Sequence, residues 1–105
     1  MSKGQYIALI TIGFGIHYVK KGDSVSMKIC EATQKRIEQL RKEKNMTVYS
    51  LIYRTGMPPS TVKSIIRGKS QNPGIVNIKK IAEGLGVSIR EFYDSEYFDD
   101  LESED

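Results

Sequence analysis

The chain has 105 residues, a formal net charge of +3, and one cysteine and one histidine, Cys30 and His17. One cysteine cannot form an internal disulfide, which fits a cytoplasmic protein, and these two side chains alone cannot supply the four ligands of a structural zinc site. No G-x-S-x-G, H-E-x-x-H or Walker sequence occurs, so no catalytic constellation can be assigned. We therefore expect one small domain with extensions that is not an enzyme and uses no metal, cofactor or small-molecule substrate.

Charge divides the chain into three segments. Residues 27–94 contain 13 Lys or Arg against 6 Asp or Glu, a balance of +7. Residues 1–26 contain 3 against 1, a balance of +2, and residues 95–105 contain none against 6, a balance of −6. A basic body suits a polyanionic partner, and the acidic tail lowers the net charge. We predict a central domain over residues 27–94 between an N-terminal extension and an acidic C-terminal tail.

The N-terminal extension contains an apolar run, residues 6–19, that is rich in β-branched and aromatic side chains. The run is too short and too interrupted by glycine to span a membrane as a helix. It is compatible with a hairpin in which Tyr6–Ile12 and Ile16–Lys20 are strands and Gly13-Phe14-Gly15 is the turn. An isolated hairpin is only marginally stable in water, so it would need a partner surface such as a second subunit.

The same segment has a second interpretation. Lys20-Lys21-Gly22-Asp23 can be encoded by an A- and G-rich run that resembles a bacterial ribosome-binding site, just upstream of the Met27 codon. Residues 1–26 would then be a translated leader, and the domain would begin naturally at Met27. The sequence leaves both interpretations open.

A first helix is predicted from about Ile29 to Lys44, with Asn45 as its C-terminal cap. Its inward stripe consists of four apolar side chains: Ile29, Ala32, Ile37 and Leu40. Its cations are assigned to the water-facing side: Lys35, Arg36, Arg41, Lys42 and Lys44. Among these cations, Arg36 could also touch a phosphate.

The stretch from Thr47 to Gly68, TVYSLIYRTGMPPSTVKSIIRG, predicts two short helices joined by a tight turn. The Thr47 hydroxyl can accept a hydrogen bond from an amide that the first helical turn leaves free. Gly56 falls where the chain must reverse, a position that favours a residue tolerant of positive φ. Pro59 can occupy the first position of the second helix, where its missing N–H would be unpaired anyway.

The second helix of this pair, from Pro59 to about Arg67, is amphipathic. Its apolar stripe, at spacings of three and four, consists of Val62, Ile65 and Ile66. The opposite side carries hydroxyls and cations: Ser60, Lys63, Ser64 and Arg67. Such groups suit base edges and phosphates, although an ordinary surface helix can have the same composition. The helix–turn–helix frame is what favours a nucleic-acid role.

Two more helices follow a polar loop, residues 69–74. The first spans about Ile75 to Leu85 and ends at Gly86. The second opens with a capping box, Ser88-Ile89-Arg90-Glu91. Beyond it, an apolar pattern continues into the acidic tail at Tyr93, Tyr97, Phe98 and Leu101. These last side chains either fray with the chain end or offer a surface to a second subunit. Their helical spacing favours docking of Tyr97, Phe98 and Leu101 as an extra turn of helix over a free tail that acts only through its charge.

Thr47–Gly68 resembles the helix-turn-helix of the Cro/C1-type (XRE) repressors of phages and bacteria. The matching residues are Leu51, Gly56, Met57, Thr61, Val62, Ile65 and Gly68. Flanking segments extend the resemblance over about Ile29 to Tyr93. It implies an all-α fold, a compact five-helix, lambda-repressor-like DNA-binding domain, here with a β-prone N-terminal extension.

The resemblance also implies that the second helix of the pair enters the major groove of double-stranded DNA while the first lies across the backbone. The candidates for base-edge contact are Ser60, Lys63, Ser64 and Arg67. The candidates for phosphate contact are Thr47, Thr61, Lys69 and Asn72. Pro59 stands where the family often has glutamine, so only apolar contact with a thymine methyl remains possible there.

These observations predict a sequence-specific DNA-binding transcriptional regulator, most simply a repressor that covers a promoter. A homodimer would be expected to read a near-palindromic site. The alternative is an antitoxin-like module whose termini bind a partner protein, with DNA binding secondary. Neither interpretation involves a membrane.

Overall fold

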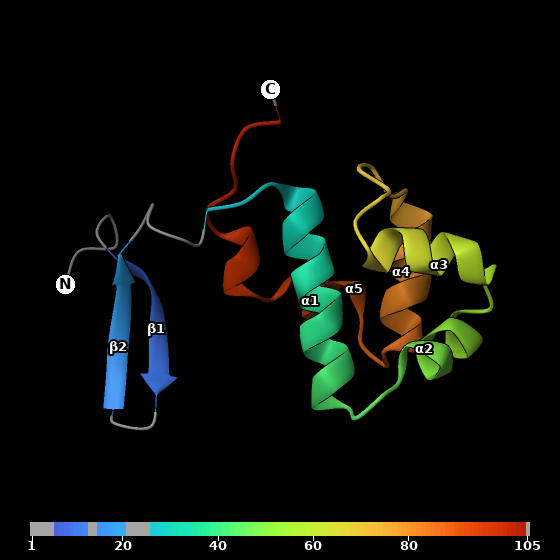
Figure 1. Ribbon diagram of the computed structural model, residues 1–105, viewed down its shortest axis with the longest axis horizontal. Helices are drawn as coiled ribbons and strands as arrows, with labels where there is room; N and C mark the ends of the chain where they lie inside the picture. The colour runs from blue at the N-terminus through green and yellow to red at the C-terminus, as the bar shows by residue number, and fades with distance from the viewer. Residues whose placement is uncertain (1–5, 13–14, 21–25, 105) are drawn as a thin grey trace.

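The computed structural model describes residues 6–12, 15–20 and 26–104, and its helices form the body shown in Figure 1. Two strands precede six helical segments. In chain order the elements are β1 (Tyr6–Ile12), β2 (Gly15–Lys20), α1 (Ile29–Glu43), α2 (Val48–Thr55), α3 (Pro59–Ile66), α4 (Ile75–Gly84), α5 (Ile89–Tyr93) and the 3-10 helix η1 (Glu96–Phe98). The five α-helices agree with the predicted all-α domain.

The two strands pair antiparallel, with Leu9 opposite Tyr18 and Ile10 opposite His17. β2 begins one residue earlier than expected, at Gly15. The rest of the expected turn, residues 13–14, lies outside the described residues. The choice between a hairpin that seeks a partner surface and a translated leader stays a prediction.

α1 ends as predicted, because Asn45 adopts the left-handed conformation with φ 52°. Its amide donates to the Lys42 carbonyl, and the Met46 amide donates to the Arg41 carbonyl, which is the paired bonding of a Schellman cap. Ala32, Ile37 and Leu40 are buried as expected.

The prediction that Ile29 belongs to this core is wrong, because its side chain is 43% exposed. It lies in the first turn of α1, two turns before Ile37, where the main hydrophobic cluster begins on this helix. Thr33 is buried instead, and its hydroxyl donates to the Ile29 carbonyl at 2.8 Å. The hydroxyl is therefore satisfied within the helix.

Two cations of α1 do not simply face water. Arg36 is half-buried and donates to the carbonyls of Phe92 and Glu91, at the end of α5. Arg41 donates to the Met46 carbonyl at 2.7 Å and to the Glu38 carboxylate. A guanidinium carries five donors in a rigid fork, so it can satisfy the carbonyls that a helix end or turn leaves free.

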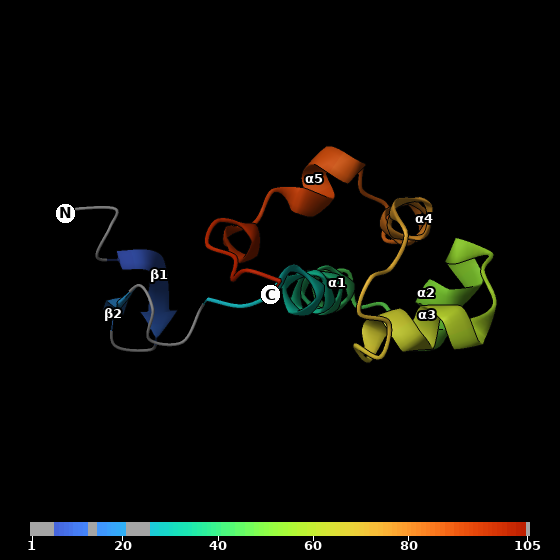
Figure 2. The ribbon, with the colours of Figure 1, turned by 90° about the horizontal axis from the view of Figure 1, so that it is seen from above.

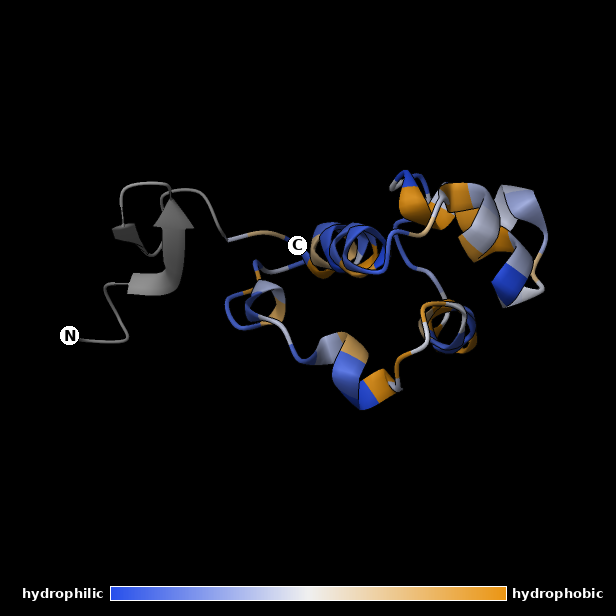
Figure 3. Cartoon of the chain, turned by 90° about the horizontal axis from the view of Figure 1, so that it is seen from below, coloured by the Kyte–Doolittle hydropathy of each residue, from blue (hydrophilic) through white to orange (hydrophobic). Residues whose placement is uncertain are grey.

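The core is shared by all five α-helices. Its most completely buried large side chains are Phe92, Ile37, Leu51, Ile81, Leu85 and Val62. Gly84 lets α4 approach α2 closely, since a Cβ at this position would lie 3.0 Å from Thr55 Cγ2 and 3.2 Å from Leu51 Cδ1. Figure 3 shows hydrophilic and hydrophobic residues on the same helices, as amphipathic packing around one core requires.

The C-terminal tail folds back onto the domain. The Phe98 ring, on η1, lies 4.9 Å from the Tyr93 ring in an edge-on arrangement. Leu101 forms an isolated parallel bridge with Met27, and the Glu102 amide donates to the Met27 carbonyl at 2.9 Å. The apolar residues of the tail therefore pack on the chain's own α1 and α5 rather than fraying, with Leu101 left 37% exposed.

Candidate DNA-binding surface

The turn between α2 and α3 has the predicted geometry. The Thr47 hydroxyl accepts a hydrogen bond from the Ser50 amide at 3.0 Å and caps α2. Gly56 ends α2 in the left-handed conformation with φ 69°, which a side chain would strain. Met57 then turns inward and is buried, so the turn is anchored to the core.

α3 presents one face to the core and one to solvent. Val62 is fully buried and Ile65 nearly so. Of the predicted base readers, Ser60 and Arg67 are exposed, while Lys63 and Ser64 are half-buried. Pro59 takes the first helical position as expected and is exposed. Arg67 itself is the C-terminal cap, because α3 ends at Ile66.

A polar hollow of about 390 Å³ lies between α3 and the start of α4. It is lined by Ser60, Thr61, Ser64, Ile65, Ser70, Asn72, Pro73, Gly74 and Asn77. The structure therefore brings four of the predicted site residues together, three from α3 and Asn72 from the following loop. Lys63, Arg67 and Lys69 do not line this hollow, and Lys69 is exposed on the loop. The contact that each residue makes with DNA stays a prediction.

Sequence analysis missed two tyrosines on α2. Tyr49 and Tyr53 lie one turn apart, 78% and 88% exposed. The Lys63 Nζ atom lies 5.8 Å from the centroid of the Tyr49 ring. The sequence did contain a signal for these residues. Because Leu51 and Ile52 give α2 its buried side, the two aromatic residues at i and i+4 are expected to face outward.

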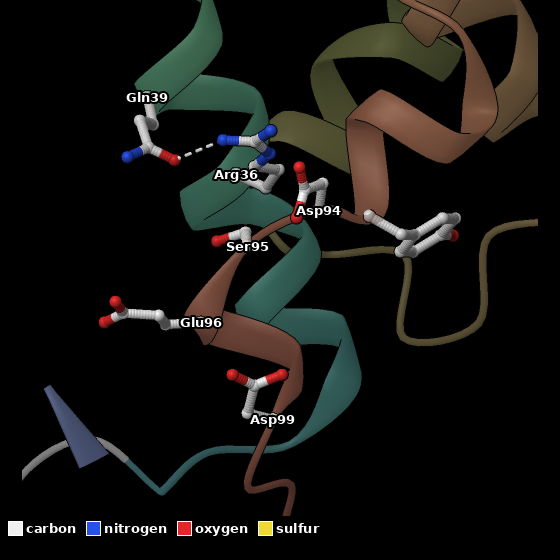
Figure 4. Close-up of a pocket in the computed structure, with 7 residues that line it drawn as sticks. Arg36, Gln39, Asp94, Ser95, Glu96 and Asp99 are labelled. Atoms are coloured by element: carbon white, nitrogen blue, oxygen red, sulfur yellow. Dashed lines mark hydrogen bonds between the residues drawn. The ribbon is translucent and has the colours of Figure 1, made fainter.

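The side of α1 that lies away from α3 is acidic. Figure 2 shows α3 and η1 on opposite sides of α1. The η1 side has a hollow of about 490 Å³, lined by Arg36, Gln39, Tyr93, Asp94, Ser95, Glu96 and Asp99 (Figure 4). Three carboxylates and one guanidinium line this hollow, and the guanidinium donates to Gln39 Oε1 at 2.8 Å. Phosphates would be repelled, so this hollow does not belong to a DNA-binding surface.

The same geometry gives Arg36 a structural role. Its Nε atom lies 2.6 Å from the Phe92 carbonyl oxygen and its Nη2 atom 2.7 Å from the Glu91 carbonyl oxygen. With Nη1 on Gln39, all three nitrogens of the guanidinium are engaged within the domain. Arg36 therefore has a structural role on the acidic side, and a phosphate contact by its remaining N–H groups stays a prediction.

The remaining titratable features are structural. Burial raises the pKa of the Cys30 thiol, with further increases from Glu104 and Glu31, so the reactive thiolate is disfavoured. Its Sγ atom donates to the Ser70 carbonyl at 3.1 Å.

Within the described residues, no group of three or more His, Cys, Asp and Glu side chains is placed to hold a metal ion. No described helix has the length and apolarity needed to cross a membrane.

Known proteins resemble this chain in sequence and in fold. Residues 37–92 match the family model described as Helix-turn-helix. A similar curated protein is the HTH-type transcriptional regulator SinR of Bacillus subtilis, which is 36% identical over 73 residues. That alignment covers 66% of this chain and 66% of SinR, so the chain spans just under two thirds of the length of this relative.

Two solved structures are similar as well. The restriction-modification controller protein C.Esp1396I, a tetramer in complex with its natural 35 base-pair operator, is 29% identical, with a TM-score of 0.58. The alignment covers 63% of this chain and 86% of that chain. The controller protein C.AhdI from Aeromonas hydrophila is also 29% identical, with a TM-score of 0.55, over 62% of this chain and 97% of that chain.

Proposed function

We propose that this chain, which belongs to the helix-turn-helix family of DNA-binding transcriptional regulators, acts as a sequence-specific repressor. Its family confirms the predicted resemblance to the Cro/C1-type regulators. The observation that carries the proposal is the solvent face of α3. This face combines hydroxyls and cations, and it is held rigidly because the opposite face is packed in the core through Val62 and Ile65.

In this proposal α3 enters the major groove, where hydroxyls and cations meet base edges. The base readers are Ser60, Lys63, Ser64 and Arg67, with Pro59 in apolar contact with a thymine methyl. Thr47, Thr61, Lys69 and Asn72 hold the protein in register on phosphates. Support comes from the shared hollow that Asn72 lines together with three α3 residues, since one stretch of DNA could contact all four.

The repressor would act as a homodimer in the cytoplasm and cover a promoter. C.Esp1396I binds its operator as a tetramer, and that relationship supports an assembly of more than one copy here. Two copies of α3 related by a two-fold axis would read half-sites about one helical turn apart, roughly 34 Å. A near-palindromic site is the expected target.

Selection of binding sites from random double-stranded DNA tests this function with the full chain. We expect enrichment of a near-palindrome, tight binding to it, and an affinity that falls as salt is raised. Lys79→Ala is a matched control, because Lys79 is exposed on α4, is paired with Glu83 at 2.9 Å and does not line the hollow beside α3. Recovery of random sequences with no preference would contradict the proposal.

An antitoxin-like interaction module remains the second candidate. Ile75 and Val76, adjacent at the start of α4, are 74% and 61% exposed, and such an apolar pair suits a protein interface. Capture of partners from the native host, with and without nuclease, distinguishes the two functions. A partner retained after nuclease treatment, together with no selected DNA site, would favour the module.

A further inference from the structure

Two large aromatic side chains are exposed to solvent on α2, the helix that precedes α3. Tyr49 and Tyr53 keep 78% and 88% of their surfaces exposed, although burial of an aromatic ring normally stabilises a small domain. They occupy successive turns on the outer side of α2. Their exposure means that they contribute little to the core, so their effect must be sought at the surface.

Tyr49 differs from Tyr53 in having a cation over its ring. The Lys63 Nζ atom is 5.8 Å from the Tyr49 ring centroid, within the range of about 6 Å over which the ring quadrupole attracts an ammonium group. Tyr49 is the second residue of α2 and Lys63 the fifth of α3, so the turn at Gly56 brings the pair together. Lys63 is correspondingly only half-exposed, unlike the exposed Lys69 and Arg67.

We infer that Tyr49 is a positioning residue for DNA reading. Its ring holds the Lys63 ammonium in a fixed orientation toward the major groove of the DNA. A free lysine side chain has four rotatable bonds and loses considerable rotamer freedom when it is fixed on a base edge. A ring that fixes it beforehand removes part of that cost. The inference rests on the proposed function, because it assigns Tyr49 a role only through the base contact of Lys63.

Two other roles for Tyr49 would behave differently. If its hydroxyl bound a phosphate directly, the loss would be equal on all DNA sequences and independent of Lys63. If it stabilised the fold, its removal would lower the melting temperature. The high exposed fraction of Tyr49 argues against a role in stabilising the fold. A double-mutant cycle with Lys63 distinguishes direct phosphate contact from the positioning role.

The experiment uses the full chain, the site selected from random DNA, and a site with the base pair read by Lys63 changed. Tyr49→Leu keeps the apolar bulk and removes the ring, Tyr49→Phe keeps the ring and removes the hydroxyl, and Lys63→Met keeps the stem and removes the charge. We expect Tyr49→Leu to weaken binding to the selected site by about 2- to 5-fold. Tyr49→Phe should bind like the parent, and Tyr49→Leu should have no further effect in the Lys63→Met background.

Tyr53→Leu is the matched control, since it removes an aromatic ring from the same side of α2 without touching the Lys63 pair. It should leave the preference for the selected site unchanged. Additive effects of Tyr49→Leu and Lys63→Met, or an equal loss for Tyr49→Phe and Tyr49→Leu, would overturn the inference.

A measurement without DNA separates this inference from the proposed function. In the free protein, the ring current of Tyr49 should shift the ε-methylene protons of Lys63 upfield in the NMR spectrum. The shift should persist in Tyr49→Phe and disappear in Tyr49→Leu. Its absence from the parent protein would overturn the pairing itself. An intact shift in a protein that selects no DNA site would instead show that the proposed function, and the reading role built on it, had failed.

Discussion

The Nε atom of Arg36 donates to the backbone carbonyl of Phe92 across 2.6 Å and ties the middle of α1 to the end of α5. Phe92 is fully buried at the centre of the core, so this bond holds its backbone while the ring is held by packing. A second bond from the same guanidinium reaches the Glu91 carbonyl. One guanidinium therefore joins α1 to α5 through two backbone carbonyls.

Arg36→Ala should destabilise the domain, because two carbonyls at the end of α5 lose a charged donor. Hydrogen bonds to charged groups contribute about 1.5–3 kcal/mol each, and partial access to water reduces the expected loss to about 2 kcal/mol in the free energy of unfolding. Urea denaturation measures it. Lys35→Ala, an exposed neighbour on the same helix, is the control, and an equally small effect of both variants would contradict the structural role.

Lys63→Ala should relax selectivity at one base pair. If Lys63 reads a guanine, its removal should cost about 1–3 kcal/mol at the selected site and little on DNA that already lacks this guanine. Titration of the variant against the four base pairs at that position gives the comparison. Equal losses on all four would show that Lys63 contacts the backbone.

Lys69→Ala should weaken binding to the selected site and to random DNA alike. Lys69 is exposed on the loop that follows α3, where an ammonium can reach a phosphate but no base edge is implied. Loss of one phosphate contact should reduce the slope of log affinity against log salt by about 1. A slope identical to that of Lys79→Ala and the parent would count against this contact.

Truncation after Asp94 should lower the melting temperature. The variant loses the packing of Phe98 against Tyr93 and Phe92, where the ring centroids are 4.9 Å and 6.4 Å apart, and the link from Leu101 and Glu102 to Met27. Half-burial of one aromatic side chain corresponds to about 1–2 kcal/mol. Phe98→Ala in the full chain should reproduce most of this loss.

A tail with Glu96, Asp99 and Glu102 changed to the corresponding amides is the control for charge. It keeps Phe98 and should retain the melting temperature. If truncation changed only the affinity for random DNA at low salt, and not the stability, the tail would act through its charge instead.

The capping box at α5 should give stability that is lost in acid. Hydrogen bonds from the Ser88 backbone amide and side chain lower the pKa of Glu91 below its ordinary value of 4.5. Because the folded pKa is the lower one, the contribution is fully present above the unfolded value and disappears as the pH falls through the folded value. Glu91→Gln should flatten the pH dependence of unfolding in this window, while Arg90→Gln should leave it unchanged.

Local signals in the sequence determined the frame of the proposed DNA-binding surface. The cap at Thr47, the left-handed turn at Gly56 and the Ser88–Glu91 box were all predictable, because each depends on contacts only a few residues apart. The burial of Val62 and Ile65 followed from the helical period in the same way. Sequence alone therefore placed α2, α3 and the start of α5.

Only the tertiary structure shows which outward-facing side chains are already engaged by another part of the domain. Arg36 looked like a solvated cation, yet its partner Phe92 lies 56 residues away. The helical spacing in the tail favoured docking of Tyr97, Phe98 and Leu101, but it gave no sign that Leu101 pairs with Met27 at the other end of the domain. The pairing of Tyr49 with Lys63 likewise depends on how α2 crosses α3. Helical periodicity shows which side chains point outward, but only the packing of distant segments fixes what they meet there.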